Sequence, residues 1–272
     1  MDTITVRQMS LAFPDDMDPV VVPGKPEESF FFLAFSLLLP YLEPYLIRTM
    51  KEARRHVTDE ALLEDLGKFN AQEGQHYKQH ARFNEIVRAQ GFPELLAIEK
   101  DLDDDYQRFS REKALRFNLA YAEGFEAFTT AMARVSFERG MDEMHPALRE
   151  LYTWHLVEEF EHRTVAFDVY EHVVGDYLYR LRVGLFAQWH MLRWCLRAQR
   201  YMLGADRGLL ERHGGAAGRR RRAWEQIRTR APKLLARVLP TYTPWYTPHR
   251  IEMPEGMQAL QDRYDAMALR LL

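Results

Sequence analysis

The chain has 272 residues, of which 47% are hydrophobic, and this is enough to bury a sizeable core. The formal net charge of −3 gives no overall bias toward nucleic acid or anionic membrane, and we read the basic run "GRRRR" at 218–222 as a solvated helix start rather than a binding patch. The single cysteine, Cys195, excludes an internal disulfide and a cysteine-based zinc site, so we expect a core thiol in a reducing compartment.

Residues 1–28 contain several prolines and predict an irregular arm. Acidic residues and the lack of a sustained apolar centre make this start unlike a secretion signal. The apolar run "FFFLAFSLLL" at 30–39 is about half the length of a membrane-spanning helix and stops at Pro40. We therefore predict no membrane span and a cytoplasmic protein.

From residue 29 to residue 204 apolar residues recur three and four apart and glycines are few, which is typical of helices. Pro93 and the turn "GMDEMHP" mark breaks between them. The pattern predicts helices near 29–55, 59–90, 104–139, 147–174 and 176–204. Long helices joined by short loops must pack antiparallel, so we expect an all-α fold, a four-helix bundle with additional C-terminal helices.

The C-terminal part is more varied. "ERHGGAAG" at 211–218 predicts a flexible break, and it is followed by a basic helix near 219–237, the extended segment "LPTYTPWYTPHRIEMP" and a short helix near 256–270. We divide the chain into the arm of 1–28, the bundle of 29–204 and a C-terminal segment of 205–272 that packs on the bundle.

The segment "WHLVEEFEH" at 154–162 places two histidines and three glutamates in nine positions. On a helix that turns about 100° per residue, His155, Glu159 and His162 fall within roughly 60° of one another. Glu158 lies on the flank of this stripe and Glu161 on the far side. Glu159 and His162 form a Glu-x-x-His pair, whose side chains lie one turn apart and can bind one metal ion together.

A second pair with the same spacing, Glu73 and His76, occurs in "NAQEGQHYKQH". Two Glu-x-x-His helices are half of a di-metal carboxylate bundle, which needs one more inward glutamate from each of two other helices. Glu43 in "LLLPYLEPYLIR" is one candidate, and "LAYAEGFEAFTTAMA" offers Glu123 and Glu126. We favour Glu126, because small residues along its side of the helix leave room for an ion.

The ligand types indicate the metal. Four carboxylates neutralise two divalent ions, whereas the same four groups buried without metal would repel one another. Oxygen and imidazole donors without thiolate suit iron or manganese better than structural zinc. We expect two iron ions, with manganese as the alternative. Each residue alone is more often a surface glutamate or a hydrogen-bonded histidine, and it is the ordered set that favours metal.

The stretches "FFLAFSLLLPYLEPYLIR", "QEGQHYKQHARFN", "FEAFTTAMA" and "YTWHLVEEFEHRTVAFDVYEHVV" resemble bacterial ferritin-like proteins labelled predicted metal-dependent hydrolases. The resemblance covers roughly residues 28–200 and implies a ferritin-like four-helix bundle. One departure is Leu42, where that family usually has glycine. The metal ligands that the resemblance implies are Glu43, Glu73, His76, Glu126, Glu159 and His162.

The additional His155 gives the order His-x-x-x-Glu-x-x-His, which is similar to the ligand pattern of the di-iron arylamine N-oxygenases, such as the p-aminobenzoate N-oxygenase. That likeness implies His155 as a seventh ligand; the alternative is a histidine that supports a ligand or fills the core. We expect His80, one turn beyond His76, to contact a ligand or line a pocket rather than bind metal. Other candidates for supporting roles are Glu158, Thr129 and Thr130.

Two reactions suit such a cluster. A di-iron oxidase or oxygenase would activate O2 and oxidise a small, partly apolar substrate, N-oxygenation being one form, with an electron donor as partner. A hydrolase would instead use a bridging hydroxide, and a third reading is a non-catalytic metal-binding bundle. Apolar surroundings favour oxidation, because hydrolysis of a phosphate or a peptide would call for a cationic side chain close to the ligands, and Arg163, next to the last ligand, faces away from the stripe. We expect no nucleic-acid partner, and a homodimer is left open.

Overall fold

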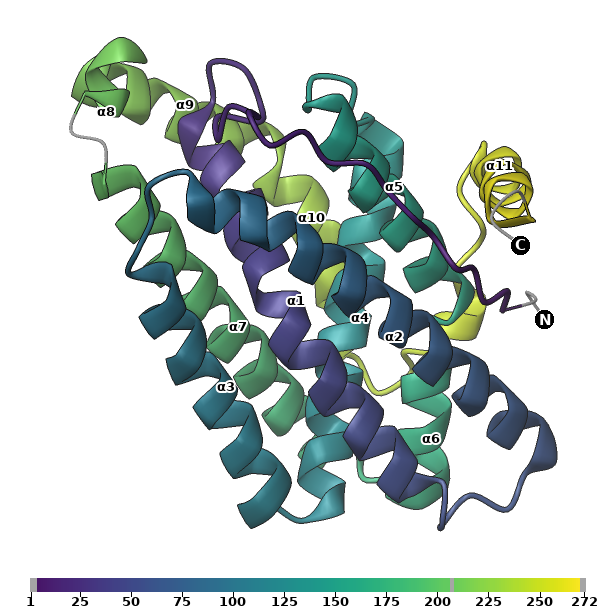
Figure 1. The fold of residues 1–272 in the computed structure, drawn as a ribbon. Helices are drawn as coiled ribbons and strands as arrows, with labels where there is room; N and C mark the ends of the chain where they lie inside the picture. Colours follow the sequence, from purple (N-terminus) through teal and green to yellow (C-terminus); the bar gives the residue numbers. More distant parts are fainter. Residues whose placement is uncertain (1–3, 206–207, 270–272) are drawn as a thin grey trace.

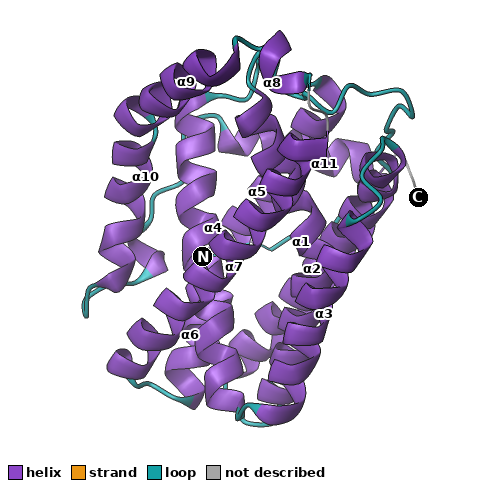
Figure 2. Cartoon of the chain, turned by 90° about the vertical axis from the view of Figure 1, so that its left-hand side faces the viewer, coloured by secondary structure: helices purple, strands orange, loops and turns teal. Residues whose placement is uncertain are grey.

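The regular structure of the chain is helical (Figures 1 and 2). The computed structural model describes residues 4–205 and 208–269, and no strand occurs among them. The predicted all-α bundle is therefore confirmed. The helices are α1 (Pro26–Ala53), α2 (Glu60–Ala89), α3 (Leu95–Glu112), α4 (Leu115–Arg139), α5 (Pro146–Glu161), α6 (Val165–Val173), α7 (Tyr177–Ala205), α8 (Leu209–Arg212), α9 (Gly215–Thr229), α10 (Ala231–Val238) and α11 (Met257–Leu269), with the 3-10 turns η1 (Leu239–Tyr242) and η2 (Pro248–Arg250).

Two predicted helices are each divided in the structure. The helix predicted over 104–139 is wrong, because α3 begins earlier and ends at Glu112, and the next helix starts after extended backbone at Lys113 (ψ 144°) and Ala114 (ψ 153°). The helix predicted over 147–174 is wrong as well, because α5 ends at Glu161 and α6 begins at Val165. Neither break contains proline or glycine, so no local signal marks it.

The C-terminal part differs from its prediction in two places, and one of them is the basic helix predicted over 219–237, which is divided into α9 and α10 at Arg230. The break predicted at 211–218 is shorter in the structure: it consists of the turn at His213 and Gly214 between α8 and α9. The predicted short helix near 256–270 corresponds to α11, which packs against α5, while α10 packs against α4. Residues 1–3, 206–207 and 270–272 of the predicted arm and C-terminal segment lie outside the described residues.

Helix α1 lies at the centre of the bundle and contacts α2, α3, α4 and α7 (Figure 1). It runs through Pro40, which has no N–H for the carbonyl of Ser36 four residues earlier. The side-chain amide of Asn84 on α2 donates to that carbonyl instead, at 2.8 Å. By length and composition alone α1 could cross a membrane, but 67% of its most apolar window is buried, as in the core helix of a bundle.

The contact between α4 and α7 depends on two glycines. A Cβ placed on Gly124 would lie 2.3 Å from the Cα of Gly184, so the two backbones touch where they cross. This close approach brings α7 against the ligand-bearing helix α4.

The N-terminal arm crosses the outside of α2 and α5 in an extended conformation (Figure 1). Alternate residues of the arm, Arg7, Met9 and Leu11, are buried. The side chain of Gln79 on α2 fixes it by donating to the Met9 carbonyl at 2.7 Å and accepting from the Leu11 N–H at 3.3 Å. The arm therefore brings a charged residue, Arg7, under the surface.

Candidate metal centre

Seven side chains from four helices meet inside the bundle. They are Glu43 on α1, Glu73 and His76 on α2, Glu126 on α4, His155 and Glu159 on α5, and His162 at the end of α5. None of the seven is more than 2% exposed. The structure thus brings together every residue that the sequence predicts as a ligand. Helix α5 ends at Glu161, directly before the last of them, His162.

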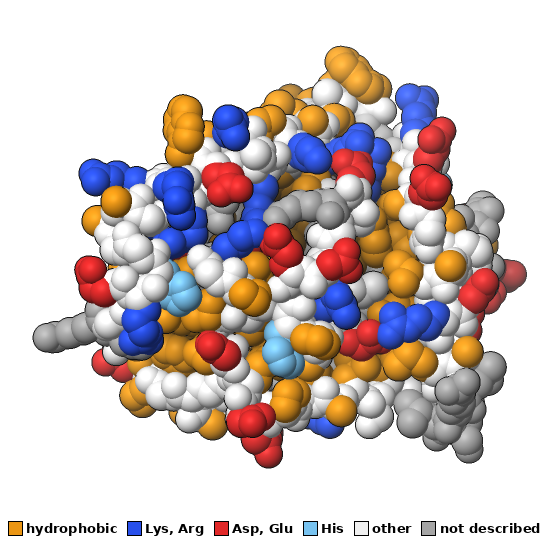
Figure 3. All heavy atoms as spheres, turned by 90° about the horizontal axis from the view of Figure 1, so that it is seen from above, with side chains coloured by type: hydrophobic (Ala, Val, Ile, Leu, Met, Phe, Trp, Pro, Cys, Tyr) orange, Lys and Arg blue, Asp and Glu red, His pale blue; other side chains and the backbone are white. Residues whose placement is uncertain are grey.

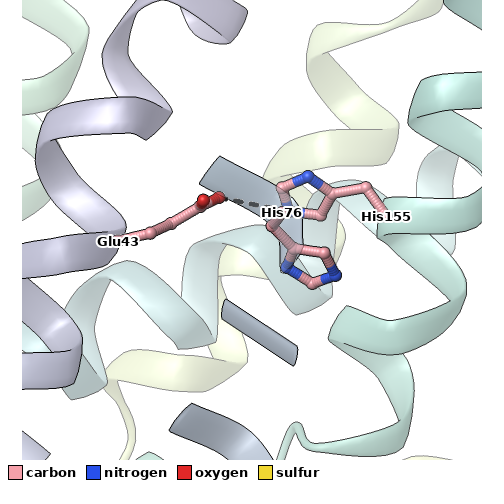
Figure 4. A group of neighbouring side chains, drawn as sticks. All are labelled: Glu43, His76 and His155. Carbon is pink, nitrogen blue, oxygen red and sulfur yellow. Dashed lines mark ion pairs between the residues drawn. The ribbon is translucent and has the colours of Figure 1, made fainter. Parts of the chain in front are cut away.

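The ligand atoms fall into overlapping groups whose members lie within 4.8 Å of one another. The first group is Glu43, His76 and His155; Glu43 extends from α1 toward the two imidazole rings, which stack with centroids 4.0 Å apart (Figure 4). The second is Glu73, Glu126 and His162, and the third is Glu73, His76 and Glu159. Glu73 belongs to the second and third groups, and His76 belongs to the first and third. The three groups therefore form one connected cluster rather than separate sites.

Many of the inward atoms of this cluster have no hydrogen-bond partner. Both carboxylate oxygens of Glu43, Glu73 and Glu126 are buried without one, and so are His76 Nδ1 and His162 Nε2. Buried polar atoms are almost always paired, because leaving them unpaired costs free energy. Divalent cations among these atoms would remove that cost, so these residues fit metal ions.

Electrostatics within the protein lead to the same conclusion. Burial, and then the neighbouring carboxylates Glu73, Glu159 and Glu126, raise the pKa of Glu43 well above its ordinary value. Burial and Glu159 likewise raise the pKa of Glu126. Burial also works to raise the pKa of Glu159, but its contacts with His155 and His162 hold that pKa well below the ordinary value. Added positive charge would favour the ionised forms of Glu43 and Glu126, the carboxylates whose pKa is raised.

Two of the histidines are held from outside the cluster. His76 Nε2 lies 3.1 Å from Glu158 Oε2, and His162 Nδ1 lies 2.9 Å from Gln72 Oε1. Each hydrogen bond fixes the orientation of the imidazole ring and leaves its other nitrogen facing the carboxylates. Histidines that bind metal usually have such a hydrogen bond at the nitrogen that does not bind the metal. Burial works to lower the pKa of His76, but the hydrogen bond with Glu158 and the nearby carboxylate of Glu73 raise it to about 9.

His155 has the same two-sided arrangement. Its Nε2 lies 2.8 Å from Glu159 Oε1 and 3.8 Å from Glu43 Oε1, and its Nδ1 lies 2.8 Å from His80 Nε2. The Ser36 hydroxyl lies 2.8 Å from His80 Nδ1. Burial, and then the neighbouring histidines, lower the pKa of His80 well below its ordinary value. His80 therefore contacts a ligand candidate and is neutral.

A buried ion-pair network lies behind α5. Arg7 is 1% exposed and donates to Glu158 at 3.2 Å, to Glu161 at 2.7 Å and to Asp265 of α11 at 2.7 Å. Glu158, which the sequence left undecided, therefore joins this network to His76. Glu161 does lie away from the ligand stripe, but it is buried there.

Arg7 is absent from the candidates that the sequence predicts, because the prolines of residues 1–28 predict an irregular arm. The signal that could have found it is the alternation of the arm, which places Arg7 on the same side as the buried Met9 and Leu11. Arg163, in contrast, faces away from the ligands as predicted and donates to the carbonyls of Phe160 and Ile251.

The remaining candidates on α4 have distinct partners. The Thr129 hydroxyl donates to Glu159 Oε2 at 2.7 Å, and the Thr130 hydroxyl is buried without a hydrogen-bond partner. Glu123 pairs with Arg180 of α7 at 2.7 Å and is absent from the three groups of ligand atoms. Of the two α4 glutamates, Glu126 is therefore the one that faces the cluster.

A family model described as "Predicted metal-dependent hydrolase" matches residues 5–251. The chain belongs to this family. No curated protein and no solved structure matches the chain. Membership of a metal-dependent enzyme family agrees with the buried carboxylate and histidine groups that could hold metal ions.

Proposed function

We propose that the seven side chains hold two iron ions in a ferritin-like arrangement, and that the protein is an O2-dependent oxidase or oxygenase. The observation that supports this most is the full burial of a four-carboxylate, three-imidazole cluster with unpaired inward atoms. Four carboxylates balance the charge of two divalent ions, and the absence of thiolate among them suits iron, with manganese as the alternative.

The surroundings of the cluster favour oxidation of a small, partly apolar substrate. Phe69 packs against His162 and Trp154 against His76, with ring centroids 4.7 and 5.0 Å apart. A small apolar molecule such as O2 enters such a site at little cost, whereas an ionic substrate would lose its hydration. N-oxygenation of an amine is one reaction of this class.

When bound, an iron pair supplies the redox chemistry that O2 activation requires. The protein orients the imidazoles through Glu158, Gln72 and His80. The Thr129 hydroxyl fixes one oxygen of Glu159. Phe69 and Trp154, which pack against His162 and His76, help to exclude water from the cluster. The proposal also includes an electron donor and a cytoplasmic location. It leaves open whether the protein forms a homodimer.

Hydrolysis is the second candidate, and the family description favours it. Hydrolysis of a phosphate or a peptide usually needs a cationic side chain in contact with the substrate. The buried Arg7 is one candidate, but it is engaged with three carboxylates on the outer side of α5. We therefore rank oxidation first.

The test begins with protein loaded with Fe(II) under anaerobic conditions and then mixed rapidly with O2. The proposal predicts a transient visible absorption and consumption of O2, both lost in the double variant Glu73→Ala with Glu159→Ala. Iron binding without O2 consumption, together with hydrolysis of a test ester, would favour the hydrolase instead.

A further inference from the structure

Helix α9 is long but is scarcely packed. Of its 15 residues only Gly215 is buried. Its inward position Arg222 reaches the bundle through two hydrogen bonds to the carboxylate of Glu27, at 2.7 and 2.8 Å. Tertiary burial of an apolar face normally stabilises a helix of this length, so α9 lacks the usual support.

Large apolar side chains of α9, of α10 and of the turn after it are exposed. Trp224 is 67% exposed, Ile227 59%, Leu235 53% and Leu239 56%. We call these four residues and the basic residues between them the α9–α10 face. An exposed apolar set of this kind, unlike a single exposed leucine, marks a contact surface.

The same face is strongly basic. Residues 215–238 contain seven arginines and one lysine but a single acidic residue, Glu225, in a chain whose formal charge is −3. Three of the arginines pair with glutamates of the bundle, namely Arg222 with Glu27, Arg230 with Glu28 and Arg237 with Glu138. Arg220 and Arg228 stand four residues before and after Trp224, so all three share one side of the helix. Figure 3 views the end that carries α8 and α9, and Lys and Arg side chains lie beside hydrophobic ones there.

We propose that the α9–α10 face docks on the surface of an anionic lipid membrane. Arginines attract lipid headgroups, and tryptophan and aliphatic side chains enter the boundary between headgroups and acyl chains. A nucleic-acid backbone would use the charge but leave Ile227, Leu235 and Leu239 in water. A second copy of this chain would bring two basic faces together.

A groove behind the face supports a lipid partner. It lies between α9–α10 and the bundle and has a volume of about 560 Å³. Its walls are mainly apolar and include Phe31, Met132, Leu196, Ile227 and Leu234. The apolar residues of this lining fit an acyl chain, and Arg219, Arg222 and Arg230 also line the groove. This docking is independent of the metal centre.

The test is co-sedimentation of the full chain with vesicles of phosphatidylcholine and phosphatidylglycerol, compared with vesicles of phosphatidylcholine alone. We expect binding to the anionic vesicles that weakens as salt is raised. Arg220→Glu with Arg221→Glu should lower the partition coefficient at least ~tenfold, since each basic residue near the surface contributes. The double variant Trp224→Ala with Ile227→Ala should also lower the partition coefficient, and it should do so even at low salt.

Matched controls change the same properties elsewhere. Arg55→Glu with Arg111→Glu alters the net charge equally, and Leu96→Ala removes an exposed apolar side chain of α3. Both should bind vesicles as the wild type does, and circular dichroism should show every variant folded. The proposal is overturned if the wild type does not sediment with anionic vesicles, if the controls lose as much binding as the test variants, or if a duplex DNA fragment binds the face and the vesicles do not.

Discussion

His155 and His80 share a hydrogen bond of 2.8 Å between Nδ1 of the first and Nε2 of the second. This bond turns the other nitrogen of His155 toward Glu159 and Glu43. Nε2 of His155 therefore faces into the cluster, and this favours a site of seven residues over a site of six.

Replacement of His155 tests this placement. If its Nε2 binds metal, His155→Ala should lower the metal stoichiometry or change the visible spectrum of the iron-loaded protein. His80→Ala should keep the stoichiometry but weaken metal affinity by ~10–100-fold, because the ring of His155 loses its support. His172→Ala changes an exposed histidine and serves as the control. A spectrum and affinity of His155→Ala equal to those of the control would remove His155 from the site.

The buried arginine of the arm is expected to be important for stability. Arg7→Met would leave Glu158 and Glu161 without their cation, and losing one partner of a buried ion pair costs about 3–5 kcal/mol. Arg263→Met, which breaks a more exposed pair with Glu150, should cost no more than about 1 kcal/mol. Unfolding in urea measures both, and equal losses in the two variants would contradict the role of Arg7.

The helix crossing predicts opposite effects at two glycines. Gly124→Ala should destabilise the protein by several kcal/mol, because its Cβ would meet the backbone of Gly184 and force α4 and α7 apart. Gly67→Ala on α2 has open space and should stabilise by about 0.5–1 kcal/mol. Thermal unfolding under one buffer condition compares them. A neutral Gly124→Ala would mean that the two helices do not touch.

Cys195 can report global unfolding. It is a buried free thiol, and burial raises the pKa of its thiol far above the ordinary value. The thiolate is the reactive form, so a thiol reagent at mildly alkaline pH should label the native protein very slowly and the urea-unfolded protein fast. Rapid labelling of the native protein would contradict the packing of α7.

Local spacing was sufficient to predict that the two Glu-x-x-His pairs face the same cluster. Glu73 and His76, like Glu159 and His162, lie one turn apart on a helix face, and this relation does not depend on the rest of the fold. The choice of Glu126 over Glu123 also agrees with the geometry, because Arg180 occupies the other glutamate. These relations could be read because helix periodicity fixes which side chains share a face.

Long-range relations could not be predicted in the same way. Arg7 reaches Glu161 across 154 residues, and nothing near either residue in the sequence indicates the other. The ends of α3 at Glu112 and of α5 at Glu161 also lack a proline or glycine. At the end of α5, His162 Nδ1 lies 2.9 Å from Gln72 Oε1 of α2, a long-range contact of this kind.

Metal analysis of the purified protein tests the central claim most directly. We predict iron, or manganese, at two ions per chain in the wild type, and loss of that metal in the double variant Glu73→Ala with Glu159→Ala, which removes carboxylates from α2 and α5. Glu64→Ala with Glu150→Ala removes two carboxylates that lie outside the cluster and should leave the metal content unchanged. A wild-type protein without bound iron or manganese, or full metal content in the Glu73 and Glu159 double variant, would contradict the account.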